Sequence, residues 1–421
     1  MRSRINAVHF IFALYVLLDV YTFFGLRSIV PTRYRRLFAL AYVLFSAFVY
    51  YHFYQLYGLL FGGQFFSSND GNFALGLFLT ALVSKLVFCG LLFFQDTLRL
   101  LWGMVRMAIG RRGARANETK PSTFLPARRK FATMAATGVA MFPFFTMLYG
   151  ITRGKYRYTV NRVKLAFQDL PPAFEGFKIV QISDIHAGSL DDKAAVMRGV
   201  RMINEEAADV VLFTGDLVNS DKNEVDPYID IFGALEAKEG KFSVLGNHDY
   251  YGVPRDDEQA ERDYWASFHE KYTAMGFHLM NNTNARIERG GESIQLLGVE
   301  NWGAGRWFPK KGDLDQALAQ TDEQDFCILL SHDPSHWDNK VLEHPRHIHL
   351  TLSGHTHGFQ FGLNMPGFKW SPAQYRYPRW MGLYEEAGQY LYVNRGFGFL
   401  AFPGRVGMWP EITVIELSTS A

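Results

Sequence analysis

The sequence has few cysteines, and its first third has few acidic residues. Cys89 and Cys327 are the only two cysteines among 421 residues, which excludes a disulfide framework and a cysteine-ligated metal cluster and leaves the redox compartment undetermined. Residues 1–155 contain 4 Asp and Glu against 18 Lys and Arg, whereas the remaining residues contain 37 against 25. The net charge of +2 therefore combines a basic first part with an acidic second part. This asymmetry predicts two modules in different surroundings.

Charged residues are also nearly absent from four long apolar runs in the basic part. These runs lie at about residues 7–26, 37–61, 73–95 and 131–151. A helix of about 20 apolar residues crosses the ~30 Å hydrocarbon core of a bilayer. Buried helices of a soluble domain normally keep a charged face, which these runs lack. We therefore predict a transmembrane domain with four helices over residues 1–155 and a second domain over residues 156–421.

The distribution of cations predicts how the spans are oriented. Lys and Arg follow span one and precede span four, whereas the loop Gly62–Asn72 contains neither. By the positive-inside rule, both basic segments lie in the cytoplasm. The second domain is then predicted on the extracytoplasmic side of the cytoplasmic membrane, although Arg2 and Arg4 argue weakly against an external N-terminus. The cations of the two segments are Arg27, Arg33, Arg35 and Arg36, followed by Arg99, Arg106, Arg111, Arg112, Arg115, Lys120, Arg128, Arg129 and Lys130.

The segment before span four carries two further predictions. Arg128-Arg129-Lys130-Phe131 resembles a twin-arginine export signal. Ordinary positive-inside residues at a helix start are the alternative, and either interpretation puts the second domain on the same side. The basic linker Gly110–Lys130, with Pro121 and Pro126, is the expected flexible segment.

Two charges interrupt the spans, Asp19 in the first and Lys85 in the third. An unpaired charge near the middle of a bilayer is costly. Both residues fall a little beyond the middle of spans that run in the same direction, so we predict an ion pair between them. A proton or ion pathway is the alternative, but it needs additional polar residues that the sequence does not indicate.

Five short motifs rich in Asp, His and Asn occur in the second part. Each follows a short apolar run with the composition of a buried strand, and a helical pattern covers Ala194–Ala207. Alternating strands and helices predict a layered α/β fold. Gly215, Gly246 and Gly354 are expected to let the backbone pass close to ions or phosphate. The motifs are Asp184-Ile185-His186, Gly215-Asp216, Gly246-Asn247-His248-Asp249, Ser331-His332-Asp333 and Gly354-His355-Thr356-His357.

The side chains in these motifs are typical of a hydrolytic centre with two metal ions. A carboxylate can bridge two cations, imidazoles suit Mn, Fe or Zn, and an amide oxygen adds a ligand without charge. So many imidazoles make Mg alone a poor match. Two cations ~3.5–4 Å apart lower the pKa of a shared water towards neutrality. This chemistry predicts attack of a metal-bridging hydroxide on phosphorus.

In order and spacing, the five motifs resemble the signature of the calcineurin-like metallophosphoesterase superfamily. The closing run Pro410-Glu411-Ile412 and the strand order are similar to the membrane-associated bacterial branch of that superfamily. The likeness covers about residues 160–418 and implies a β-sandwich flanked by helices. It implies a first metal bound by Asp184, His186 and His357, a second bound by Asn247, His332 and His355, and Asp216 as the bridge.

The resemblance also implies roles for the residues that do not bind metal. His248 is similar to the family's catalytic histidine, which contacts the phosphoryl oxygens or protonates the leaving oxygen. Asp249 is expected to fix the tautomer of His248. Phe359 stands where relatives often have Gly and is expected to narrow the site or to form an apolar wall.

The predicted activity is that of a membrane-anchored, metal-dependent phosphoester hydrolase with two divalent ions, Mn as the first expectation and Fe or Zn as alternatives. The expected substrate is a phosphomonoester, phosphodiester or pyrophosphate bond in a lipid head group, because tethering beside the substrate plane raises its effective concentration. An anchored hydrolase of soluble nucleotides or small phosphoesters is the first alternative. A non-enzymatic metal-bound sensor is the second, and it would be expected to lack a ligand. Membrane lipids are expected partners. Nucleic acid is not an expected partner, because the second part of the chain is acidic and repels a polyanion. The oligomeric state is not predicted.

The tail from Phe368 to Pro410 leaves two interpretations open. It is crowded with Trp, Tyr, Phe and Arg, including the stretch from Arg395 to Arg405. Apolar tips flanked by Arg suit a loop that dips into the lipid head-group zone. Packing of the same residues within the domain or against the spans is the alternative.

Overall fold

The computed structural model of the chain describes residues 2–61, 69–110, 126–306 and 308–420. It divides into two compact units, one formed by Met1–Gly58 with Ala74–Tyr149 and the other by Leu59–Phe73 with Gly150–Ala421. The predicted boundary at residue 155 stays a prediction. The loop Gly62–Asn72, the linker Gly110–Lys130 and the side chains of Arg128 and Arg129 lie largely or wholly outside the described residues.

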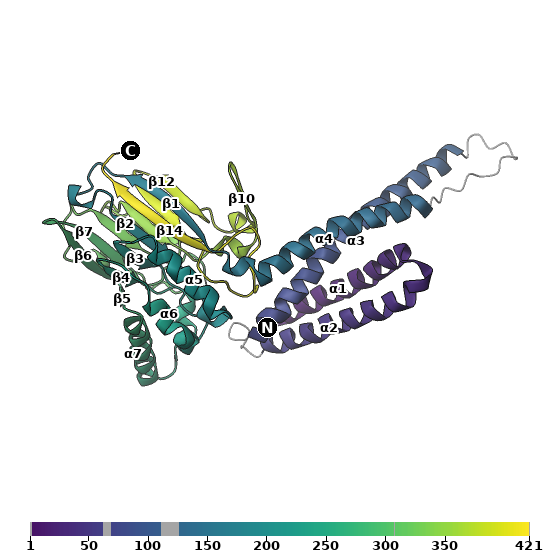
Figure 1. Cartoon of the computed structure of the whole chain (residues 1–421), viewed down its shortest axis with the longest axis horizontal. Helices are drawn as coiled ribbons and strands as arrows, with labels where there is room; N and C mark the ends of the chain where they lie inside the picture. Colours follow the sequence, from purple (N-terminus) through teal and green to yellow (C-terminus); the bar gives the residue numbers. More distant parts are fainter. Residues whose placement is uncertain (1, 62–68, 111–125, 307, 421) are drawn as a thin grey trace. The chain divides into compact units, whose positions relative to one another are not determined.

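The first unit consists of four long helices, as the sequence predicts (Figure 1). Each contains a stretch long and apolar enough to cross a membrane, at Val8–Ile29, Thr32–Tyr57, Gly71–Val105 and Lys130–Thr152. The third helix continues past the predicted end at residue 95, because residues 96–105 remain largely apolar and Asp96 and Arg99 pair at 3.5 Å. The helices are α1 Arg2–Ile29, α2 Arg35–Phe61, α3 Asn69–Gly110 and α4 Pro126–Thr152.

The predicted ion pair between Asp19 of α1 and Lys85 of α3 is confirmed. The Asp19 carboxylate also accepts hydrogen bonds from the hydroxyls of Tyr42 and Tyr50, both at 2.8 Å. Lys85 Nζ donates to the Tyr15 hydroxyl at 2.6 Å. The expectation that few polar residues surround the pair was therefore wrong. The tyrosines lie on other turns and another helix, so the local sequence around each charge did not reveal them.

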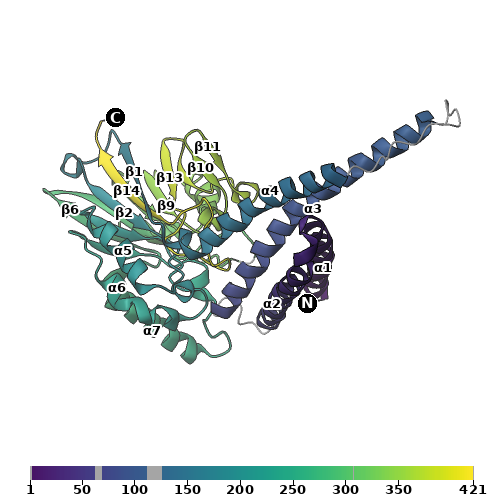
Figure 2. The same ribbon diagram turned by 45° about the vertical axis from the view of Figure 1, so that its right-hand side comes forward.

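The second unit contains two six-stranded sheets (Figure 2). The first sheet has the order β1-β14-β2-β3-β4-β5, and the second has the order β12-β13-β9-β8-β7-β6. The strands of the first are β1 Thr159–Ala166, β14 Glu411–Ser418, β2 Lys178–Ile182, β3 Val210–Phe213, β4 Gly240–Ser243 and β5 Phe277–Leu279. Those of the second are β12 Gly382–Glu386, β13 Gln389–Val393, β9 Leu350–Ser353, β8 Cys327–Leu330, β7 Glu292–Gly298 and β6 Thr283–Arg289.

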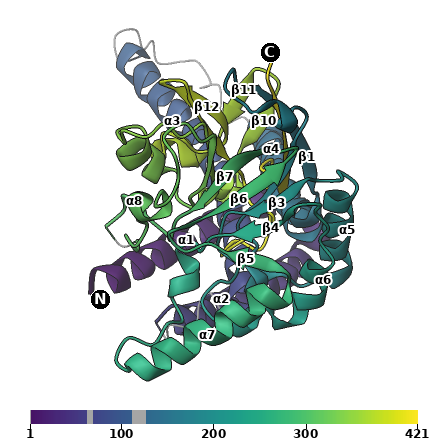
Figure 3. The same ribbon diagram turned by 90° about the vertical axis from the view of Figure 1, so that its left-hand side faces the viewer.

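The two sheets pack face to face, and helices cover their outer faces. Along β2, Ile179 packs between the sheets, whereas Val180 and Ile182 pack against the helix layer. Strands buried on both faces read as continuous apolar runs, which is how β3 and β8 appear in the sequence. Figure 3 shows α5 (Lys193–Asn204), α6 (Ile229–Gly233) and α7 (Glu258–Ala274) beside the first sheet, with α8 (Leu314–Ala317) near the second. The predicted α/β class, a β-sandwich flanked by helices after four apolar helices, is confirmed.

Candidate metal centre

Parallel strand pairing explains why distant motifs meet. Strands β2, β3 and β4 are parallel neighbours in the first sheet, and β8 and β9 are parallel neighbours in the second. Parallel strands end at the same edge of a sheet, and loops at that edge carry ligand sites. All five polar motifs directly follow the carboxyl ends of these five strands. The candidate ligands therefore lie where strands end and loops begin, as predicted.

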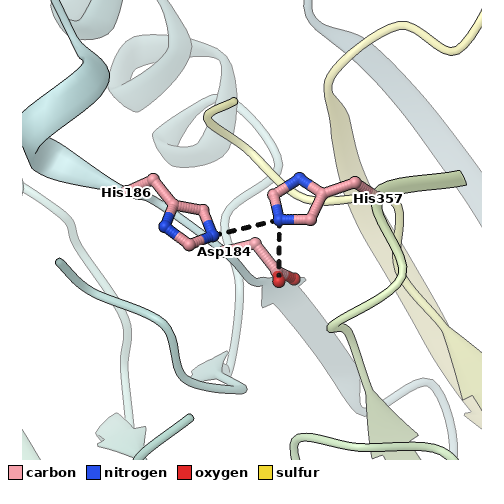
Figure 4. Close-up of side chains that lie close together, drawn as sticks. All are labelled: Asp184, His186 and His357. Atoms are coloured by element: carbon pink, nitrogen blue, oxygen red, sulfur yellow. Dashed lines mark hydrogen bonds and ion pairs between the residues drawn. The ribbon is translucent and has the colours of Figure 1, made fainter. Parts of the chain in front are cut away.

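The first group of candidate ligands is Asp184, His186 and His357 (Figure 4). His186 Nε2 lies 3.0 Å from His357 Nε2, which lies 3.2 Å from Asp184 Oδ1. One ligand atom from each residue falls within 4.8 Å of the other two, and all three residues are buried. This spacing allows a single divalent ion to contact all three.

The second group is Asp216, His332 and His355. His332 Nε2 lies 3.2 Å from Asp216 Oδ2, and the three ligand atoms again fall within 4.8 Å of one another. His355 Nε2 bonds the Tyr377 hydroxyl at 3.0 Å and lies 3.5 Å from Asp333 Oδ2. These contacts leave His355 Nδ1 as the nitrogen available to an ion.

One carboxylate oxygen connects the two groups. Asp216 Oδ2 lies 3.2 Å from His332 Nε2 in the second group and 3.6 Å from His186 Nε2 in the first. A carboxylate placed between two groups of ligands in this way can bridge two neighbouring cations. Its other oxygen, Oδ1, accepts the His248 N–H at 2.8 Å, which fixes the orientation of the side chain.

Buried acceptors near these groups fit a bound cation. His332 Nδ1 donates to the Thr214 carbonyl at 2.7 Å, which leaves a lone pair on Nε2. A backbone partner on one ring nitrogen commonly orients the other toward a metal. Within the described residues, His332 Nε2 and Asn247 Oδ1 are buried and make no hydrogen bond. Asn247 Nδ2 donates to the Tyr251 hydroxyl at 3.2 Å, so its oxygen is the atom left for an ion.

The electrostatics also suit metal ligands. Burial lowers the pKa of His186, His248 and His355, which keeps these imidazoles neutral. Burial alone would raise the pKa of Asp216, but the nearby charge of His332 holds it well below the usual range. Burial would lower the pKa of His332, but the charge of Asp216 raises it to about 10. A metal ion would compete with a proton for this nitrogen.

The backbone at the candidate ligands is strained. Asp184, His186, Asp216, His355 and His357 all have positive φ, between 47° and 71°. Residues other than Gly avoid this region, and such strain tends to gather at functional sites. The motif glycines also lie very close to the candidate ligands. A Cβ on Gly246 would lie 2.2 Å from Asp216 Oδ1, and one on Gly354 would lie 2.2 Å from Asp184 Oδ2. These glycines therefore pass close to the ligand side chains themselves.

His248 lies against the first group. Its ring centroid is 4.9 Å from that of His186, and its Nδ1 lies 2.7 Å from the Asn219 carbonyl. A carbonyl only accepts, so Nδ1 carries the proton and the lone pair of the neutral ring is on Nε2. The predicted role of Asp249 in setting this tautomer was wrong, because the carbonyl of Asn219 occupies that position.

Asp249 instead joins two loops. Its carboxylate accepts main-chain N–H groups of Gly246, Asp216, Leu217 and Val218, at 2.8 to 3.3 Å. It is fully buried, and burial, followed by the charge of Asp216, raises its pKa to about 7, while the N–H donors of Gly246 and Val218 lower it in part. Asp249 therefore fixes the loops that carry Asp216 and Asn247 relative to each other.

A cavity of about 520 Å³ lies beside the second group. Phe308 and Tyr377 line it and contact the His355 ring, with centroid distances of 4.8 and 5.3 Å. Asp333 and Arg376 line it as well. Phe359 lies edge-on to Tyr377 at 6.2 Å but is not among the residues that line the cavity, so its expected role stays a prediction. The cavity combines aromatic and charged side chains next to a group that could hold a metal ion.

Several residues near the candidate centre were missed from the sequence. Tyr377 is 22 positions from His355, and Arg405 Nη2 lies 3.2 Å from His357 Nδ1 across 48 positions. The Asn219 contact is a main-chain carbonyl, which carries no side-chain signal. Only Asp333, adjacent to His332 within a predicted motif, had a local signal.

The stretch from Arg395 to Arg405 packs inside the unit. Arg395 is buried and pairs with Glu411, and Arg405 is buried with its guanidinium on the carbonyls of Arg395 and Gly398. Phe397 and Phe399 are also buried. For these residues the packing interpretation holds, and the interpretation as a loop in the head-group zone was wrong.

The second unit has two six-stranded sheets, and at the strand ends one carboxylate joins two groups of Asp and His. This combination is typical of metal-dependent phosphoesterases. Residues 177–359 match the family "Calcineurin-like phosphoesterase", and residues 1–155 match the family "Probable Calcineurin-like phosphoesterase, transmembrane domain". The metallophosphoesterase YkuE of Bacillus subtilis, whose printed name calls it uncharacterized, is 31% identical over 60% of this chain and 82% of its own. The chain belongs to the calcineurin-like phosphoesterase family.

Two other relatives have informative names. The "Transmembrane protein with metallophosphoesterase domain" of Danio rerio is 31% identical over 64% of this chain, and the match spans 60% of its own length. The "UDP-2,3-diacylglucosamine pyrophosphatase LpxG" of Chlamydia trachomatis is 27% identical over 55% of this chain and 81% of its own. The four apolar helices and the matching transmembrane family together identify a membrane protein.

Proposed function

We propose that this chain hydrolyses a phosphomonoester, phosphodiester or pyrophosphate bond, with two divalent ions held by Asp184, His186, Asp216, Asn247, His332, His355 and His357. The observation that carries the proposal is the position of Asp216 Oδ2, 3.6 Å from His186 Nε2 and 3.2 Å from His332 Nε2. Two cations at such a site supply an acidified water and positive charge for the phosphoryl oxygens. Mn is the first expectation, with Fe or Zn as alternatives, because the donors are mainly imidazoles and carboxylates.

The protein's own groups position the reaction. His248 Nε2 carries the lone pair because Nδ1 faces the Asn219 carbonyl at 2.7 Å. Protonated, that nitrogen can donate to a phosphoryl oxygen or to the leaving oxygen. Asp249 holds His248 near the bridging carboxylate indirectly, through the loop N–H groups that it binds. Burial of Asp216 and His332 limits the access of bulk water to these ligands.

We infer that the substrate is a lipid-linked phosphate ester. The catalytic unit follows four candidate membrane spans, and the cavity next to His355 has the aromatic walls of Phe308 and Tyr377. The relative LpxG is named for a pyrophosphate with two acyl chains. An anchored hydrolase of soluble nucleotides or small phosphoesters is the alternative, and Arg376 at the cavity would suit a second phosphate of such a substrate.

A metal-reconstituted assay on the purified full chain tests the proposal. The panel comprises lipid phosphomonoesters, lipid pyrophosphates and soluble nucleotide esters. Asp216→Ala is expected to lower kcat by at least about 10³-fold and to reduce bound metal from two ions to one or none, since both ions lose a ligand. Asp216→Asn keeps the shape of the side chain but not its charge. Its kcat and its bound metal are expected to lie between those of the wild type and those of Asp216→Ala. Full activity in Asp216→Ala would overturn the shared-carboxylate mechanism, and preference for soluble esters would favour the alternative substrate.

A further inference from the structure

Exposed apolar side chains of the second unit are concentrated in one segment. Among the described residues from 153 to 420, seven large hydrophobic side chains are exposed. Six of them lie between residues 359 and 383, and the seventh is Tyr251 near His248. Soluble surfaces usually scatter such residues, so a cluster marks an interaction surface. The six are Phe359, Leu363, Met365, Phe368, Tyr375 and Leu383.

The centre of the cluster is a short β-hairpin, β10 (Leu363–Met365) and β11 (Phe368–Trp370), which stands out from the two sheets (Figure 1). Leu363 pairs with Trp370, and Met365 pairs with Phe368. Because directly paired residues share a face and positions two apart do as well, these four side chains form one apolar face. Leu363, Met365 and Phe368 are 48%, 51% and 50% exposed.

The polar face of the hairpin borders a hollow of the second unit. Asn364 and Lys369 are paired on the opposite face. Both line a hollow of about 370 Å³ together with Arg162 of β1, Leu383 of β12 and Glu411 of β14. An ordinary surface hairpin packs its apolar face on the protein and exposes its polar face. Here both faces of the hairpin are exposed, so the apolar face (Leu363, Met365, Phe368 and Trp370) is not packed on the unit in the usual way and needs another covering.

The charge of the segment differs from that of the unit around it. Residues 359–383 contain Lys369, Arg376 and Arg379 and no Asp or Glu. Residues 156–421 as a whole contain more acidic than basic residues. Arg379 pairs with Asp338 and Glu386, so Lys369 and Arg376 carry the local excess of positive charge. Apolar side chains with flanking cations match an anionic lipid surface.

The hairpin is also connected to the end of a membrane helix. The N–H of Arg405 donates to the carbonyl of Gly150, near the end of α4, at 3.2 Å. The next residue, Val406, bridges to Phe361, and its carbonyl accepts the N–H of Gly362 at 2.9 Å. Strand β10 begins at the following residue, Leu363. The base of the hairpin is therefore linked to the end of α4 through the main chain of Arg405 and Val406.

We propose that hairpin β10–β11 docks on the membrane that holds the four spans, with Leu363, Met365 and Phe368 in the head-group region and Arg376 on anionic phosphates. Docking itself depends on membrane anchorage, and its effect on catalysis rests on the proposed function. It would hold the candidate metal centre at a fixed height over the lipid surface, in addition to the tether at α4. Since the hairpin surface is small, we expect docking to need the tether and not to replace it.

The direct test places a fluorescent label on the full-length protein. Met365→Cys is labelled with an environment-sensitive dye and reconstituted in nanodiscs of mixed anionic and zwitterionic lipid, with or without lipids that carry a quencher in the upper acyl chain. Cys89 and Cys327 are buried and give little background. Ala274→Cys, on the exposed last residue of α7, is the matched control. We expect a blue shift and quenching at position 365 and neither at position 274, with weaker quenching in purely zwitterionic nanodiscs. Equal emission at both positions would overturn the proposal.

A second test separates docking from activity. The triple variant Leu363→Ser/Met365→Ser/Phe368→Ser is expected to raise KM for a lipid-embedded phosphate ester about tenfold or more, with kcat/KM for a soluble ester unchanged. An unchanged KM for the lipid substrate would contradict a role in catalysis. If the wild-type chain cleaves no ester at all, the proposed function fails, while the quenching experiment still decides whether the hairpin docks. Disulfide-linked dimers of Met365→Cys without quenching would assign the face to a second copy of the chain and overturn docking on lipid.

Discussion

At the scale of single residues, the main-chain carbonyl of Asn219 decides how His248 can act. The contact of 2.7 Å with Nδ1 fixes both the ring orientation and the tautomer. A side-chain partner could gain or lose a proton, whereas a carbonyl always accepts. The histidine can therefore cycle its Nε2 proton without rearranging its support. The candidate ligand His332 has an equivalent support from the Thr214 carbonyl, so the support alone does not separate an acid from a ligand and the two roles call for a direct test.

Replacement of His248 tests this role directly. His248→Ala is expected to lower kcat by about 10²- to 10⁴-fold, the usual contribution of one positioned acid or base. Bound metal, measured by plasma mass spectrometry, should stay near the wild-type value, because the seven proposed ligands remain. His269→Ala, an exposed histidine on α7, serves as the control and should keep full activity. Loss of metal in His248→Ala would instead make this histidine a ligand.

Asp249 gives a different expectation. Asp249→Asn replaces a carboxylate that accepts four main-chain N–H groups with an amide that has one acceptor oxygen. We expect a destabilisation of about 2–4 kcal/mol, because buried donors lose their partners. Activity should fall together with Tm in thermal unfolding of the purified protein. A variant with normal Tm and strongly reduced kcat would restore the catalytic role that the sequence first suggested.

The candidate ligands could be predicted from the sequence because each is tied to a local pattern. Asp184 and His186, for example, directly follow a strand whose apolar run is legible, and their residue types already imply metal chemistry. The contacts that orient the ligands could not be predicted in this way. The Thr214 carbonyl on His332 is a main-chain group, and Tyr377 reaches His355 through a fold that brings distant loops together.

At the scale of elements, helices and strands differed in how well the sequence revealed them. The spans were legible from length and lack of charge, but the continuation of α3 from residue 95 to Gly110 was not, since Asp96 and Arg99 interrupt the apolar run. The hairpin β10–β11 was hidden for another reason. Its turn, Pro366-Gly367, is a local signal, yet only strand register shows that its apolar face points away from the unit. The earlier choice between a lipid loop and packing was therefore too coarse, because residues 395–405 pack while the hairpin does not.

The contact between α1 and α3 supports a prediction about helix association. Asp19→Asn leaves Lys85 without its counter-charge in an apolar region, and breaking a buried pair in this way costs about 3–5 kcal/mol. We expect a clear loss of stability of the full chain in detergent, measured by unfolding with increasing denaturant. Asp19→Asn/Lys85→Met removes both charges and should recover most of that loss. A double variant as unstable as the single one would point to the tyrosine hydroxyls, and not the ion pair, as the main contribution.

At the scale of the whole molecule, the uneven distribution of charge is the feature that the sequence shows most directly. The first 155 residues carry most of the excess of Lys and Arg, and the rest is acidic. Lys and Arg near short loops set membrane orientation, while acidic residues contribute little to it. The acidic second part leaves its cation-binding centre in a field that favours divalent ions and disfavours polyanions. Charge thus bears on both the sidedness of the unit and the ligands it attracts.

Sidedness follows from the arginines between α1 and α2, which are Arg27, Arg33, Arg35 and Arg36. If they are cytoplasmic, each of the four spans reverses the direction of the chain and the second unit lies outside. Alkaline phosphatase fused after Ala421 should then be active in a Gram-negative host, because it needs an oxidising compartment for its disulfides. β-Galactosidase fused at the same position should be inactive. Fusions of both reporters after Arg36, which keep all four arginines, are the controls and should give the opposite pattern. Active β-galactosidase after Ala421 would place the catalytic unit in the cytoplasm, and the docking of hairpin β10–β11 would then have to occur on the inner leaflet.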